Sequence, residues 1–148
     1  MDRQITQILS DLVAGYGRQV KIYKELLHLT QQEGAVIAAG DSLGLTELLY
    51  LEDELIGHAR KIDERQRCMK QALLALMPGN ELGLERLACL AEPDVYIKFK
   101  ENLLTIKKML AGIEEQKNEN IKVLREKLQH AQQEITPRET TEPYDSVG

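Results

Sequence analysis

Three long stretches of this chain carry apolar residues at alternating steps of three and four, and this spacing constrains the fold more than any other feature. The first stretch lies between Ile5 and Ile37, and the last between Phe99 and Ile135. In the middle stretch, the apolar residues one heptad apart are Leu48, Leu55, Ile62, Met69 and Leu76. Such spacing places apolar side chains along one side of a helix. We therefore expect an all-α fold: an elongated, antiparallel, coiled-coil-like helical bundle of three long helices plus one short helix.

Glycine and aspartate mark the boundary between the first two expected helices. The first helix should run from about residue 3 to residue 38, because Gly40 suits a left-handed position after a helix end. Asp41 or Ser42 can cap the second helix. That helix should extend to about Met77, before the turn signal Pro78-Gly79-Asn80. Because the connection at residue 40 is short, the two helices should form an antiparallel hairpin.

The second half of the chain should contain a short helix, a third long helix and a tail. Asn80 can cap the short helix, and Pro93 should end it. Asp94 can then cap the third long helix, which runs to about Ile135. The remaining residues have no helical period, and their polar, proline-containing composition is typical of a disordered tail.

Length and composition fit one domain in the cytoplasm. The 148 residues form a helical domain over 1–135, followed by the tail over 136–148. We find no signal peptide, and no apolar run approaches the roughly 20 residues of a membrane span, so we expect no membrane insertion. The net charge of −5 argues against a nucleic-acid partner. Cys68 and Cys89 have neither disulfide-framework nor zinc-site spacing, which favours two reduced thiols.

We find no pattern of residues that indicates catalysis or metal binding. Glu25-Leu26-Leu27-His28 fits the Glu-x-x-His motif of di-iron bundles, but such a site needs two copies and two further inward glutamates. There is no second copy, and the apolar stripe leaves Glu25 outside it. We therefore expect no catalytic residues, no metal and no cofactor, and we do not expect an enzyme.

Two pairs of residues, Glu52 with Gln66 and Gly15 with Gly17, each allow two interpretations. Glu52 and Gln66 share a heptad register with Leu45, Ala59 and Leu73 on the second helix. We favour a shallow seam from which both polar side chains reach outward, over a role in setting helix register.

The second pair is Gly15 and Gly17, which each weaken the interior of the first helix by about 1 kcal/mol relative to alanine. A close contact between helices is the favoured reason for keeping them there, and a local hinge is the alternative.

The order of helices and two motifs resemble the FlgN-type flagellar export chaperones. The resemblance covers roughly residues 3–135, and it includes the Ala-Gly-Asp break at 39–41 and the Leu/Glu-rich start of the second helix. Late in the third helix, Asn118 and Asn120 precede the Ile-x-x-Leu run of Ile121 and Leu124. Together with Leu128, these are the residues that match the family's partner-binding region by position. The tail is short for the family.

The resemblance implies a cytosolic chaperone without ATP use. It would bind flagellar hook-associated proteins of the hook–filament junction, keep them unpolymerised and deliver them to the export gate of the flagellar type III secretion apparatus. The residues suit this role, because an apolar helix stripe that is incompletely covered can receive a client's amphipathic helix.

We expect such a client-binding face on the late third helix, formed by Asn118, Asn120, Ile121, Leu124, Leu128 and Ile135. Burial of Ile121, Leu124 and Leu128 against the first two helices is an equally weighted alternative. In the tail, Tyr144 could dock on the export gate, although an idle exposed residue is the favoured reading.

Two rival functions stay open, as does the choice between monomer and homodimer. One is a structural coiled-coil scaffold or adaptor without an export role. The weaker one is an adaptor that binds nucleic acid through a basic cluster, for which a solvated helix face is the favoured reading. The cluster consists of Arg60, Lys61, Arg65, Arg67 and Lys70.

Overall fold

The computed structural model describes residues 3–77, 79 and 83–141, including the side chains of these residues other than 84, 85 and 135–141. Its regular elements are the helices α1 (Arg3–Ala39), α2 (Ser42–Leu76), α3 (Leu84–Leu90) and α4 (Pro93–Thr141). Over these residues the predicted all-α bundle of three long helices and one short helix is confirmed. No described helix has the length and apolar character that crossing a membrane requires.

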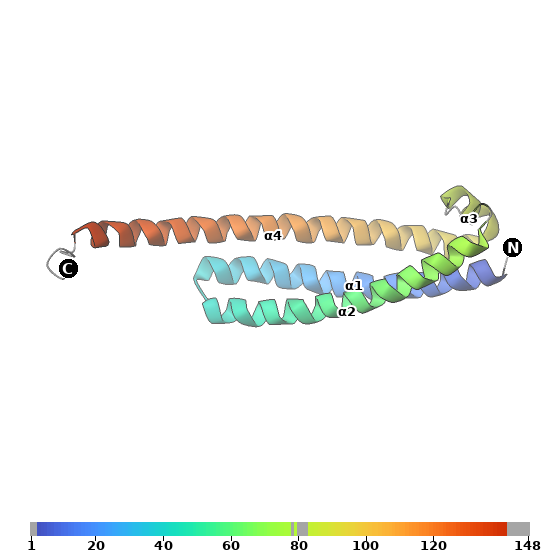
Figure 1. Cartoon of the computed structure of the whole chain (residues 1–148), viewed down its shortest axis with the longest axis horizontal. Helices are drawn as coiled ribbons and strands as arrows, with labels where there is room; N and C mark the ends of the chain where they lie inside the picture. Colours follow the sequence, from blue (N-terminus) through green and yellow to red (C-terminus); the bar gives the residue numbers. More distant parts are fainter. Residues whose placement is uncertain (1–2, 78, 80–82, 142–148) are drawn as a thin grey trace.

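Helix α1 is the central element of the bundle, because both α2 and α4 pack against it while the backbones of α2 and α4 scarcely approach each other. Consecutive long helices run in opposite directions (Figure 1). The residues of α1 with steps of four and three are buried along nearly its whole length: Ile5, Leu9, Leu12, Tyr16, Gln19, Tyr23, Leu26, Thr30, Glu33 and Ile37. The spacing of three and four residues thus gives α1 a continuous buried seam.

The turn between α1 and α2 has the predicted glycine and aspartate roles. Gly40 has a φ of 72°, and its N–H donates to the carbonyl of Ile37 at 3.1 Å. The N–H of Asp41 donates to the carbonyl of Val36 at 3.0 Å, which completes a Schellman ending. The Asp41 carboxylate then accepts from the N–H of Gly44 at 2.9 Å and caps α2.

The apolar core is concentrated at the end of the bundle where α3 lies (Figure 1). Here the start of α1, the end of α2, α3 and the start of α4 meet, and the rings of Tyr16 and Phe99 pack with their centroids 5.9 Å apart. The buried apolar residues of this cluster are Ile5, Leu9, Leu12, Tyr16, Leu73, Met77, Leu87, Ala91 and Phe99. A smaller cluster around Tyr23, Leu26 and Ala59 continues the core toward the hairpin turn.

Two predicted helix boundaries differ from the structure. Asp94 does not cap α4, because α4 begins at Pro93 and the carbonyl of Glu92 accepts the first helical hydrogen bond, from Tyr96, at 3.0 Å. Proline suits the first position of a helix, where its fixed φ is already helical and its missing N–H costs nothing. Asp94 instead lies in the first turn, where its negative charge interacts favourably with the positive end of the helix dipole.

The predicted cap Asn80 lies outside the described residues, and Gly83 occupies the N-cap of α3. Helix α4 continues to Thr141 rather than ending near Ile135, so the first part of the predicted tail is helical. The rest of that tail, residues 142–148, lies outside the described residues.

Helix α4 extends beyond the α1–α2 hairpin, at the end opposite to α3 (Figure 1). Leu124 and Lys127 still line a small hollow together with hairpin-turn residues, among them Ile37, Gly40 and Leu45. Every described side chain from Arg125 to Glu134 is exposed. We call residues 121–134 the overhang of α4.

Candidate functional site

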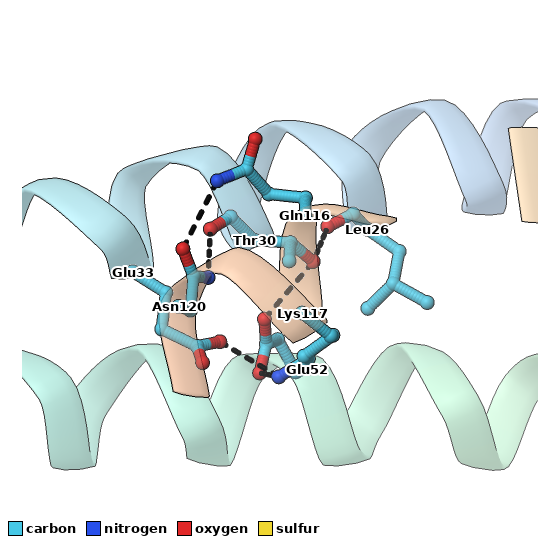
Figure 2. Close-up of polar contacts among 7 residues, drawn as sticks. All are labelled: Leu26, Thr30, Glu33, Glu52, Gln116, Lys117 and Asn120. Carbon is cyan, nitrogen blue, oxygen red and sulfur yellow. Dashed lines mark hydrogen bonds and ion pairs between the residues drawn. The ribbon is translucent and has the colours of Figure 1, made fainter. Parts of the chain in front are cut away.

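A layer of polar side chains crosses the bundle just before the overhang, where α1, α2 and α4 meet (Figure 2). Thr30 and Glu33 come from α1, Glu52 from α2, and Lys117 and Asn120 from α4. The residues of the layer stand at the inward-facing heptad positions that apolar residues occupy elsewhere in the bundle. It therefore replaces one layer of the core, and it requires hydrogen bonds to offset the loss of hydration.

Lys117 links the other two helices to α4 through two ion pairs. Its Nζ lies 2.7 Å from Oε2 of Glu33 and 2.8 Å from Oε2 of Glu52. The side chain of Glu52 is only 3% exposed, whereas that of Lys117 is 34% exposed and so reaches the layer from its rim. Two carboxylates thus share one ammonium group, and the layer is acidic overall.

This arrangement shifts the pKa values of two of the groups. Burial raises the pKa of Glu52, a hydrogen bond with Glu33 raises it further, and Lys117 lowers it without cancelling the rise. Burial acts to lower the pKa of Lys117, but the hydrogen bonds and negative charges of Glu33 and Glu52 outweigh burial and leave that pKa raised. A proton therefore binds to this layer more tightly than to the separate side chains.

Asn120 belongs to the interior of the layer. Its Nδ2 donates to the backbone carbonyl of Thr30 at 2.8 Å, and its Oδ1 accepts from Nε2 of Gln116 at 3.0 Å. A Cβ atom on Gly34 of α1 would lie 2.7 Å from that Oδ1, so the glycine allows the amide to approach. Our expectation that Asn120 forms part of an exposed client face is wrong, because only 2% of it is exposed.

A second polar position, Gln66 of α2, lies nearer to α3. Its Nε2 donates to the carbonyl of Leu12 at 2.9 Å, and its side chain packs on Gly15 so closely that a Cβ there would be 2.6 Å from Cδ. Our prediction that the side chains of Glu52 and Gln66 reach outward from a shallow seam is therefore wrong, since both residues are buried. The close contact predicted for Gly15 is confirmed, whereas nothing lies within 4 Å of a Cβ on Gly17.

The overhang presents the remaining predicted client residues. Ile121, Leu124 and Leu128 follow Lys117 at steps of four, three and four, so they continue the side of α4 that faces α1 and α2. All three are exposed, Leu128 to 56%. The structure thus brings these three together on an uncovered face rather than in the core.

Asn118 is exposed next to the overhang, while Asn120 points into the bundle. The side chain of Ile135 and all of Tyr144 lie outside the described residues. The heptad register could have shown which of the two asparagines is buried. Asn120 lies seven residues after Ile113, which faces the core, whereas Asn118 does not share this spacing.

The structure also places the residues of the metal-binding motif, the two cysteines and the basic cluster that the sequence analysis considered. Over those residues no group of three or more His, Cys, Asp or Glu side chains is placed to hold a metal ion. Glu25 and His28 are exposed, and so are both thiols, Cys68 and Cys89. The residues of the basic cluster on α2 are exposed as well, and Lys70 lies over the ring of Tyr16, 5.4 Å from its centroid.

Comparison with family models, curated proteins and solved structures gave no match for this chain. A proposal about its function therefore rests on the residues and on the geometry described above.

Proposed function

We propose that this protein is an export chaperone of the FlgN type that binds flagellar hook-associated proteins in the cytoplasm. In this role it keeps the junction proteins unpolymerised and delivers them to the flagellar type III export gate. It performs no catalysis, and it needs no cofactor for this task.

The uncovered apolar face of the overhang carries the proposal. Along most of α4 the same side of the helix packs against α1, but near the hairpin turn and beyond it Ile121, Leu124 and Leu128 are incompletely covered and exposed. Leu124 also borders the hollow at the hairpin turn, so an incoming helix can contact both α4 and the turn. An amphipathic helix with apolar residues at matching spacing would cover this face, as in other helix-in-groove complexes.

The polar layer supports the proposal, because it holds α4 in a defined register against the hairpin. The bonds of Lys117 and Asn120 reach α1 and α2 immediately before the overhang begins. The overhang therefore projects from a fixed point, and less conformational entropy is lost when a client binds to it.

The test is binding of a purified hook–filament junction protein to this chain and to two variants. Leu128→Asp places a charge at the centre of the proposed face, where burial by a client becomes unfavourable. Leu110→Asp is the matched control, since Leu110 is a 45% exposed leucine on α4 that lies before the overhang and outside the hollow at the hairpin turn. We expect Leu128→Asp to weaken calorimetric binding at least tenfold and to abolish the inhibition of client polymerisation. Equal binding by all three proteins contradicts the site.

The alternative function is a structural coiled-coil scaffold or adaptor, which the same uncovered stripe favours because two copies could pair through it. Sedimentation equilibrium separates the two functions. A stable homodimer that Leu128→Asp dissociates, combined with no binding to a junction protein, would support the scaffold instead.

A further inference from the structure

A second uncovered apolar surface lies on the first half of α4, far along the helix from the overhang. Ile97 and Leu104 are 50% and 55% exposed, although both are large and apolar. They line a shallow groove along the helix with Tyr96, Lys100, Glu101, Leu103 and Lys107, so its charged lining is two lysines and one glutamate. We call this surface the proximal groove; the overhang begins only at residue 121.

The groove lies in a positively charged segment of an acidic protein. Between Val95 and Leu110 the charged residues are four lysines and one glutamate, which gives a net charge of +3, whereas the whole chain carries −5. These lysines are Lys98, Lys100, Lys107 and Lys108. Lys100 is positioned over the ring of Tyr96, with its Nζ 5.5 Å from the ring centroid, so its ammonium group is held at the groove.

The spacing of these residues defines the shape of a complementary partner. Ile97 and Leu104 lie one heptad apart, as do Lys100 and Lys107, so each pair is about 10 Å apart along the helix axis. A helix offers no free backbone edge for strand pairing, so recognition along it is through side chains, and the heptad spacing of both pairs matches a second helix. A helix lying alongside meets both pairs if its own apolar and acidic residues repeat every seven positions.

We infer that the proximal groove binds an amphipathic helix of another protein, whose apolar stripe is bordered by carboxylates one heptad apart. The apolar residues supply most of the affinity, and the two lysines select an acidic over a basic partner. This surface is separate from the overhang, so the inference does not depend on the proposed chaperone function.

The experiment uses the full chain and two labelled synthetic helical peptides. Both peptides carry the same heptad-spaced leucines; one has glutamates beside them at heptad spacing, and the other has lysines there. We expect the acidic peptide to bind at least tenfold more tightly than the basic one by fluorescence anisotropy. The preference should shrink as the salt concentration rises, since exposed charges are screened.

Two double variants and one control identify the surface. Both double variants are made in a Leu128→Asp background, so that the overhang does not supply a second site for the peptides. There Lys100→Glu/Lys107→Glu should reverse the preference, and Ile97→Asp/Leu104→Asp should remove binding of both peptides. Arg125→Glu, on the overhang, should change neither result, and circular dichroism should show unchanged helix content for all three. All substituted residues are exposed, so the variants should fold.

Three outcomes would overturn the inference. The first is no preference between the peptides, or a preference that survives the double charge reversal. The second is a homodimer that the charge reversal dissociates, because the occupant is then a second copy of this chain. The third is binding to vesicles of anionic lipid that exceeds binding to the acidic peptide, which would make the groove a membrane-contact surface.

Discussion

Lys117 of α4 lies 2.8 Å from the carboxylate of Glu52 on α2, although the backbones of these two helices scarcely approach each other. The long lysine side chain spans the gap from the rim of the bundle, while Glu52 is buried beneath it. The same ammonium group also pairs with Glu33 of the central helix. One side chain thus joins three helices one heptad before Leu124, which lies beside the hairpin turn.

Removing Lys117 should destabilise the protein more than neutralising Glu52. Lys117→Met leaves two carboxylates close together without a counter-charge, and we expect a loss of about 1–3 kcal/mol, less than for a fully buried pair because Lys117 is partly exposed. Glu52→Gln removes the excess negative charge and keeps the pair with Glu33, so it should change stability by less than about 1 kcal/mol. Urea denaturation measures both, with Lys122→Met on the exposed face of α4 as the control. A larger loss for Glu52→Gln than for Lys117→Met would refute this account of the layer.

The free energy of unfolding should fall as the pH rises above about 4.5, the ordinary pKa of a glutamate. Because the pKa of Glu52 is raised in the folded state, folding takes up a proton between that value and the raised pKa, and the lower pH favours the folded state. In Glu52→Gln this part of the pH dependence should disappear. Denaturation curves collected across this range test the assignment, and an identical slope in the variant would contradict it.

The raised pKa of Lys117 acts in the alkaline range. Its contribution to stability should be complete below 10.5, its ordinary pKa, and should be lost as the pH rises through the raised value. Lys117→Met should therefore lose less stability than the unmodified protein between neutral pH and strongly alkaline pH. Denaturation at a series of alkaline pH values gives this difference.

Alanine at Gly15 and at Gly17 should have opposite effects. A methyl group on Gly15 would collide with the buried Gln66 side chain, and overpacking of this kind costs about 1–3 kcal/mol. At Gly17 nothing lies within 4 Å of the new Cβ, so the higher helix propensity of alanine should stabilise the protein by up to about 1 kcal/mol. Thermal melting of the two variants provides the comparison. Equal destabilisation at both positions would mean that Gln66 is not the cause.

Aspartate at Leu128 should be tolerated by the free protein, whereas aspartate at Leu9 should not. Leu128 is exposed on the overhang, and surface substitutions usually change stability by no more than about 0.5 kcal/mol. Leu9 is fully buried in the core cluster, so an uncompensated carboxylate there should largely unfold the bundle. Circular dichroism at rising temperature distinguishes these results. Early melting of Leu128→Asp would show that the overhang is packed in solution.

The heptad pattern was sufficient to predict the helices, because a helix must bury one side and the periodicity reveals which residues lie on that side. The turn at Gly40 and Asp41 was equally predictable, since a left-handed glycine and a capping aspartate are local features of the chain. The start of α4 was misplaced by two residues. Pro93 and Asp94 both favour a helix start, and the hydrogen bond from Tyr96 to the carbonyl of Glu92 shows that the helix begins at Pro93.

The arrangement of the residues proposed to bind a client was predicted in part. The spacing of Ile121, Leu124 and Leu128 places them on one side of α4, and the structure confirms this arrangement. The spacing cannot tell whether that side is covered, since coverage depends on where the α1–α2 hairpin ends beside α4. The functions of these residues and of Tyr144 stay predictions.

The sequence by itself determined the number and type of the helices, their approximate lengths and the hairpin turn, because these depend on residues within one or two turns of each other. The tertiary structure decided which polar residues are buried. Glu52, Gln66 and Asn120 become favourable inside the bundle only because Lys117 and the backbone carbonyls of Leu12 and Thr30 reach them from other helices. Hydrogen bonds between residues so distant in the chain leave no local pattern, and so only the packed helices reveal them.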